Sequence, residues 1–167
     1  MDTSKVANKE AVAFLNAFLL HRGINKKYFS LVPEDKYDYR MVNTPERKSD
    51  SPRDSLAHHI NVENTYILGI ETGLLKFGSA YNKDLMIKSK KELLDLLEQS
   101  DNHLIDLLSK DENINKLVSV PWNKDGIRAI DMLWSLNSHE ILHTGWNLAV
   151  MDHLNIERFP ELKQIWG

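Results

Sequence analysis

The 167-residue sequence contains no cysteine. This absence excludes disulfide bonds, thiolate nucleophiles and cysteine-ligated zinc sites, so any metal ligand must come from histidine, aspartate or glutamate. The sequence also contains no apolar run that approaches the ~18 residues of a membrane-spanning helix. The segment Met1-Asp2-Thr3-Ser4-Lys5 lacks the basic and apolar regions of a secretory signal. We therefore expect a cytoplasmic location.

A strong excess of one charge is missing too. The formal net charge is −3, and this near balance gives no broad basic field for nucleic acid or an anionic membrane. Hydrophobic residues make up 42% of the chain and charged residues 27%, which is ordinary for a globular protein. The length suits a single domain over residues 1–167 with a core of its own.

Apolar periodicity predicts four long helices, over about residues 8–31, 52–72, 84–109 and 127–154, and a short extended segment over 114–122. Ser51 is the expected N-cap of the second helix, with Pro52 in its first turn and Gly73 at its end. The predicted fold class is all-α, a four-helix antiparallel bundle. In such bundles, facing helices project ligands inward.

Two histidines in the last predicted helix are the main functional signal. His139 and His143 are one helical turn apart, so both imidazoles can face one metal ion. Their spacing continues an apolar series formed by Met132, Leu136, Trp146 and Val150. A single histidine on such a face is more often a hydrogen-bonded core residue, but two at this spacing favour a metal site.

A third ligand is expected from the second helix, which contains His58 and His59 in succession. Neighbouring residues differ by about 100° around a helix axis, so only one of the two can point into the core. His59 shares its face with Leu56, Ile60, Glu63, Ile67 and Ile70, which favours His59 as the ligand. Glu63 on the same face is expected to support an imidazole or to accept a proton near the metal.

The other candidates are weaker. His21 is a possible additional site residue, whereas His103 and His153 are expected at the surface. Tyr66 and Trp146 either line a pocket or belong to the core.

The blocks Leu56-Ala57-His58-His59-Ile60, Pro121-Trp122, His139-Glu140 and His143-Thr144-Gly145 together give the chain a resemblance to the DinB/YfiT superfamily of metal-binding helical bundles, which extends to the terminal Ile165-Trp166-Gly167. The resemblance implies one divalent metal held by His59, His139 and His143, although His58 could also align with the first ligand. It further implies a small-molecule substrate and a homodimer. Members of the superfamily include S-transferases that use low-molecular-weight thiols and proteins described as metal-dependent hydrolases.

Donor type alone leaves zinc, nickel and iron open as the metal. Three imidazoles leave coordination positions for Lewis-acid chemistry, in which Glu63 or Glu140 would be the proton acceptor. The alternative is a non-catalytic protein in which the metal clamps helices or reports metal availability.

Two other classes of metalloprotein fit the sequence less well. His139-Glu140-Ile141-Leu142-His143 matches the H-E-x-x-H motif of zinc proteases, but Trp146 and Ala149 stand where one extended form of that motif needs glycine and histidine. A di-iron bundle needs a second E-x-x-H motif, which the sequence lacks.

Overall fold

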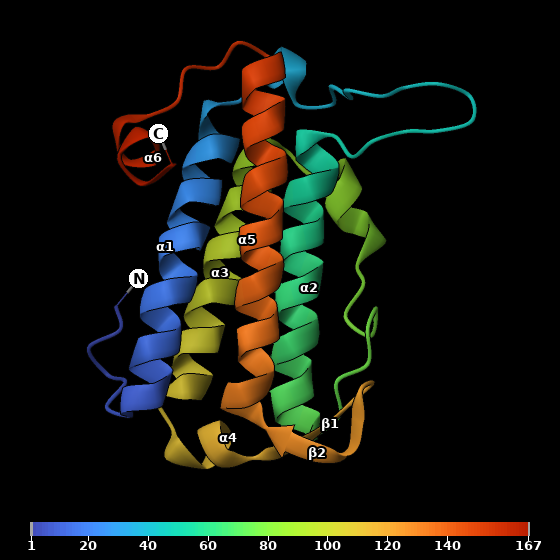
Figure 1. Cartoon of the computed structure of the whole chain (residues 1–167). Helices are drawn as coiled ribbons and strands as arrows, with labels where there is room; N and C mark the ends of the chain where they lie inside the picture. The colour runs from blue at the N-terminus through green and yellow to red at the C-terminus, as the bar shows by residue number, and fades with distance from the viewer. Residues whose placement is uncertain (1, 167) are drawn as a thin grey trace.

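The computed structural model describes residues 2–166 of the chain (Figure 1). Gly167, the last residue of the terminal block in the resemblance, lies outside the described residues. The single domain over residues 1–167 stays a prediction.

Four long helices lie side by side in Figure 1: α1 (Lys9–Leu31), α2 (Pro52–Thr72), α3 (Lys90–Leu108) and α5 (Ala129–His153). Helix α1 contacts α3 and α5, and α2 also contacts α3 and α5. The chain is therefore mostly helical, and the long helices lie close to the predicted ranges.

The ends of α2 follow the predicted signals. The Ser51 side chain accepts a hydrogen bond from the backbone N–H of Asp54, and Pro52 occupies the first turn. Gly73 ends the helix with a φ of 77°, a left-handed conformation that glycine adopts without a Cβ clash. Local sequence therefore determines both ends of the helix that carries His58 and His59.

The predicted helix over residues 84–109 is interrupted. A short 3₁₀ segment, η2 (Lys83–Ile87), precedes α3, and Ser89 separates the two. The Ser89 side chain accepts a hydrogen bond from the backbone N–H of Glu92, and the Glu92 side chain accepts one from the backbone N–H of Ser89. This reciprocal cap starts a new helix, so the prediction of one continuous helix was wrong.

The all-α prediction was also wrong in one part of the chain. Strands β1 (Leu117–Val120) and β2 (Asn123–Arg128) form a small antiparallel sheet at one end of the long helices (Figure 1). The predicted extended segment over 114–122 contains β1, but its first residues belong to the short helix α4 (Asp111–Asn115). The remaining short elements are η1 (Glu34–Lys36) and α6 (Pro160–Trp166).

The interior consists of two apolar clusters with buried polar side chains between them. One cluster includes Phe14, Phe18 and Leu136, and the other includes Phe29, Leu56 and Val150. The polar side chains come from all four long helices: Arg22, Asn25, His59, Glu63, Asp101, Glu140, Thr144 and Asn147. Within residues 2–166, no helix combines the length and the apolar character that a bilayer span requires.

Candidate metal centre

Three histidines from two helices converge beside the buried polar layer. His58 on α2 lies with its Nε2 atom 3.0 Å from Nε2 of His139 on α5, and Nε2 of His143 lies 3.1 Å from the same His139 atom. One ligand atom from each ring lies within 4.8 Å of the others. His58, His139 and His143 could therefore hold a metal ion.

The contacts at His139 test whether a cation fits there. A ring nitrogen carries either one hydrogen or one lone pair, so Nε2 of His139 can make only one good hydrogen bond along its ring axis. Two other nitrogens nevertheless lie about equally close to it. Tetrahedral zinc with bonds of about 2.0–2.1 Å would separate its nitrogen ligands by about 3.3 Å. Lone pairs from all three rings can point at a single cation. The three nitrogens are therefore better placed to bind a common metal ion than to form hydrogen bonds with each other.

The histidines have the protonation state that metal binding needs. Burial is the main cause that lowers the pKa of His139 to about 4 and that of His143 to about 3, and neighbouring histidines add to the effect. Burial also lowers the pKa of His58. Neutral imidazoles are the form that binds metals. Near pH 7 the His139 and His143 rings are therefore available as ligands.

His59 belongs to the buried polar layer behind this group. Its Nδ1 atom lies 2.9 Å from Oε2 of Glu140, and because a carboxylate only accepts hydrogen bonds, Nδ1 carries the hydrogen. Asn25 donates from Nδ2 to Oε1 of Glu140 over 2.7 Å. The His59 ring lies 4.8 Å from the His143 ring between centroids. Glu140 and Asn25 thus fix the orientation of His59 immediately beside a candidate ligand.

The Arg22 guanidinium is the charge centre of the layer. It lies 3.2 Å from carboxylate oxygens of Glu63 and Asp101 and 3.4 Å from one of Glu140, and all four side chains are fully buried. Burial raises the pKa of Glu140, but Arg22, His59 and the hydrogen bonds outweigh it and hold that pKa well below its usual range. Burial raises the pKa values of Glu63 and Asp101, and Arg22 opposes this only in part. Arg22 and Lys26, whose Nζ lies 3.6 Å from Oδ2 of Asp101, supply two positive charges for three carboxylates, so the layer favours a proton on Glu63.

The prediction for the third ligand differs from the arrangement in the structure. The helical periodicity predicts His59 as the buried member of the pair, and His59 is 1% exposed. The group of converging donors, however, contains His58, which is exposed. The choice of His59 follows from a site inside the core, whereas the histidines converge at the edge of the helices, where α2 and α5 meet a cavity.

The two predicted proton acceptors lie in the polar layer. Glu63 contacts Arg22, and Glu140 contacts His59, Asn25 and Arg22. Both carboxylates are fully buried. Their role as proton acceptors stays a prediction.

The remaining candidates are spread over the molecule. His103 is exposed and lies 3.1 Å from a Glu71 carboxylate oxygen, as expected for a surface histidine. His153 is also exposed and lies near Tyr39. His21 is half-buried and is not in the group of converging donors.

Sequence reasoning missed Arg22, Asn25 and Asp101. The sequence does contain a signal for Arg22 and Asn25. Both residues continue the helical spacing of Phe14 and Phe18 on the core-facing side of α1. Polar residues at positions expected to face the core indicate a buried network.

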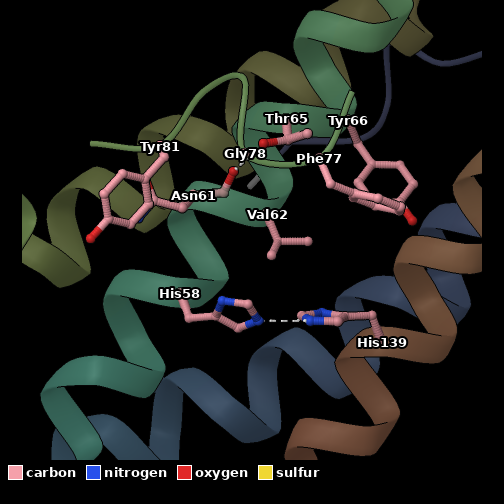
Figure 2. Close-up of a pocket in the computed structure, with 9 residues that line it drawn as sticks. All are labelled: His58, Asn61, Val62, Thr65, Tyr66, Phe77, Gly78, Tyr81 and His139. Carbon is pink, nitrogen blue, oxygen red and sulfur yellow. Dashed lines mark hydrogen bonds between the residues drawn. The ribbon is translucent and has the colours of Figure 1, made fainter. Parts of the chain in front are cut away.

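A cavity of about 410 Å³ adjoins the histidine group (Figure 2). His58 and His139 lie on one side of it, and Val62 points into the space between them and the aromatic rings. The cavity is lined by His58, Asn61, Val62, Thr65, Tyr66, Phe77, Gly78, Tyr81 and His139. Tyr66 therefore lines a pocket and also belongs to the buried apolar core, so it has both of the roles that the sequence left open.

A second cavity, of about 630 Å³, borders His143. Its lining includes Trp146, together with the charged Arg47, Lys48 and Asp50 from the segment before α2. The two cavities differ in chemistry, because the first has no Asp, Glu, Lys or Arg in its lining.

No protein-family model matches the chain, and a comparison with curated proteins gives no match either. Among solved structures, the chain is similar to YjoA from Bacillus subtilis, described as a DinB-like protein, with a TM-score of 0.65 and 16% sequence identity. The match covers 89% of this chain and 95% of YjoA. At this identity the likeness establishes the fold, which agrees with the resemblance drawn from the sequence.

Proposed function

We propose that this chain, whose fold is DinB-like, binds one divalent metal ion through His58, His139 and His143 and acts on a small molecule as a metal-dependent transferase or hydrolase. The proposal depends on one observation, the convergence of three ring nitrogens from two helices. The DinB-like fold agrees with the resemblance to the metal-binding DinB/YfiT superfamily drawn from the sequence, which adds support to this proposal.

The donor set is compatible with zinc, nickel or iron. A bound ion would supply Lewis-acid polarisation at positions that the three imidazoles leave open. The adjoining cavity supports chemistry over a closed structural role, because it gives a small molecule room next to His58 and His139.

The affinity for metal is expected to be modest. Metal-ligating histidines usually donate their second ring N–H to an oxygen acceptor, and losing such a partner weakens binding about 10–100-fold. Among the described residues, no protein group lies within hydrogen-bond distance of the buried Nδ1 atoms of His139 and His143. Metal should therefore be added before its content is measured.

In this proposal Glu140 orients the His59 ring. Glu63 acts on Glu140 through Arg22, which contacts both carboxylates. The same placement of Glu140 speaks against a zinc protease, in which the glutamate of H-E-x-x-H must reach the water that attacks the peptide. Proton acceptance by Glu63 or Glu140 at the metal would require that the buried network rearranges.

Elemental analysis of dialysed, zinc-loaded variants tests the ligands. His58→Ala, His139→Ala and His143→Ala should each reduce bound zinc strongly, while His103→Ala and His153→Ala should retain it. His59 remains the alternative first ligand from the sequence. Loss of zinc in His59→Ala together with full retention in His58→Ala would return that role to His59.

A cobalt-substituted sample separates an enzyme from a non-catalytic metal clamp. Titration with a small thiolate should change the visible spectrum if the ion has an exchangeable position. An unchanged spectrum would support the clamp.

We further propose that α1, α2, α3 and α5 are the four helices of the antiparallel bundle expected from the sequence, and that the chain forms a homodimer. Trp134 and Ile141, seven residues apart on α5, are large exposed apolar side chains on the same side of the helix, where a second copy of the chain could cover them. Light scattering of the purified chain measures the oligomeric state, and a monomer at all concentrations would contradict the dimer.

A further inference from the structure

We propose that the 410 Å³ cavity binds an uncharged aryl or branched alkyl group of the substrate and directs the reacting end of that molecule at His58 and His139. This inference rests on the proposed function and specifies the substrate class. We call this space the aromatic cavity.

The lining of the aromatic cavity is mostly apolar, with Asn61 and Thr65 as polar members beside the two histidines, and it contains no Asp, Glu, Lys or Arg. Tyr66, Phe77 and Tyr81 surround it, with Val62 between them and the histidines (Figure 2). A charged group placed there would lose part of its hydration without gaining an ionic partner, which disfavours its binding. The cavity volume lies within the range of about 300–1,000 Å³ that is typical of small-molecule sites.

The aromatic rings expose apolar surface to water, and a bound ligand would cover that surface. Phe77 is 57% exposed and Tyr81 is 67% exposed, although both rings border the cavity. Phe77 stacks with Trp122 at 6.3 Å between ring centroids, and Trp122 is itself 53% exposed. Apolar side chains that remain exposed around a hollow are characteristic of ligand sites.

Hydrogen bonds hold the segment that carries these rings at both ends. Leu75 donates its backbone N–H to the Ser119 carbonyl on β1 over 2.8 Å. At the other end, the Asn82 backbone N–H donates to Oδ1 of Asn61 on α2 over 2.8 Å. Gly78 between them has a φ of 78°, which allows the turn that brings Phe77 and Tyr81 to the same cavity.

The position of the histidines determines which end of the bound molecule lies near the candidate metal ligands. His58 and His139 belong both to the candidate metal ligands and to the lining of the aromatic cavity. An apolar group among the rings would therefore place its polar end at the histidines. A small molecule suits this site better than a protein surface, because the recognition elements surround a hollow of limited volume.

Binding to metal-free protein tests the apolar preference without any contribution from a metal. Calorimetric titration at pH 7 with 2-naphthol and 2-naphthoate compares an uncharged ring system with a charged one of similar shape. We expect 2-naphthol to bind at least about tenfold more tightly. Equal or tighter binding of 2-naphthoate would overturn the inference.

Two variants and a control locate the bound molecule. Val62→Phe should occupy the cavity, and Phe77→Ala should remove one wall, so each should weaken 2-naphthol binding about tenfold. Phe77 is exposed, so its loss should leave the fold intact, which circular dichroism checks. Arg47→Ala in the second cavity should leave 2-naphthol binding unchanged. Unchanged binding in both cavity variants would contradict the proposed location.

Zinc-loaded protein tests the direction of the bound molecule. Acetohydroxamate and benzohydroxamate share a metal-binding group, and only the second carries a ring. Benzohydroxamate should bind about tenfold more tightly to the wild type, and this advantage should disappear in Phe77→Ala. A ring advantage that persists in Phe77→Ala would overturn the inference. Failure of both hydroxamates to bind, with 2-naphthol binding intact, would instead overturn the proposed metal function.

Discussion

The Nδ1 atom of His59 lies 2.9 Å from Oε2 of Glu140, and both side chains are buried. The pair joins α2 to α5 inside the molecule, and Glu140 also provides one of the carboxylates around Arg22. This contact couples the stability of the helices to the orientation of a ring next to the candidate metal ligands.

Replacement of this carboxylate should destabilise the fold. Glu140→Ala removes the acceptor of the His59 N–H and one acceptor of the Asn25 side chain, while Arg22 keeps Glu63 and Asp101, so we expect a loss of about 2–4 kcal/mol in the free energy of unfolding. Urea denaturation followed by circular dichroism measures it. Glu46→Ala, at an exposed position, is the control and should change stability by less than about 0.5 kcal/mol. Equal stabilities of the two variants would contradict a structural role for the buried contact.

Glu63 should make stability depend on pH in a defined direction. Its pKa is raised well above the ordinary value, mainly by burial, so the folded state binds a proton that the unfolded state releases. The resulting stabilisation is complete below the unfolded pKa of ~4.5 and is lost as pH rises through the folded pKa.

Glu63→Gln cannot lose this proton, so its unfolding free energy should fall less than that of the wild type as pH rises from about 4.5. Urea denaturation at several pH values measures both slopes. Parallel curves for the wild type and Glu63→Gln would show that Glu63 does not titrate abnormally.

Metal binding should stabilise the folded chain, because the three histidines come together only when α2 and α5 are packed. At a free zinc concentration 100 times the dissociation constant, the gain is about 2.7 kcal/mol. Thermal unfolding with and without zinc, monitored by circular dichroism, checks this. His58→Ala should lose most of the gain, and a zinc effect of undiminished size in that variant would exclude His58 as a ligand.

Two glycines should respond in opposite ways to replacement by alanine. Gly73 has a φ of 77°, and an added Cβ would meet no atom closer than 3.6 Å, so Gly73→Ala should cost about 1–2 kcal/mol through backbone strain alone. Gly145 lies within α5, and a Cβ there would have no neighbour within 4 Å. Gly145→Ala should therefore stabilise the chain by up to ~1 kcal/mol. Urea denaturation of both variants measures the difference, and the same sign of change in both would contradict it.

Local signals in the sequence predicted much of the helical structure. Ser51 and Gly73 bound α2 as expected, because capping depends on the residues at the helix ends. The break at Ser89 was missed although its capping box is also local, since the apolar periodicity of α3 continues into η2. The sheet was missed because Asn123–Arg128 is polar and its pairing with β1 depends on a turn that brings the strands together.

The candidate site was predicted in part for a similar reason. The spacing of His139 and His143 indicates a common helix face whatever the tertiary structure, and both rings belong to the converging group. The choice between His58 and His59 depends on whether the site lies in the core or at its edge. That depends on the packing of α2 against α5, which the periodicity of a single helix does not contain.

His58 is exposed, whereas His139 and His143 are half-buried. The outermost donor therefore already faces solvent when the chain has folded, and an ion can reach the inner pair without separation of the helices. Under the proposed function, folding and metal acquisition need not occur together, so an ion bound at these histidines could exchange with the surroundings without global unfolding of the chain.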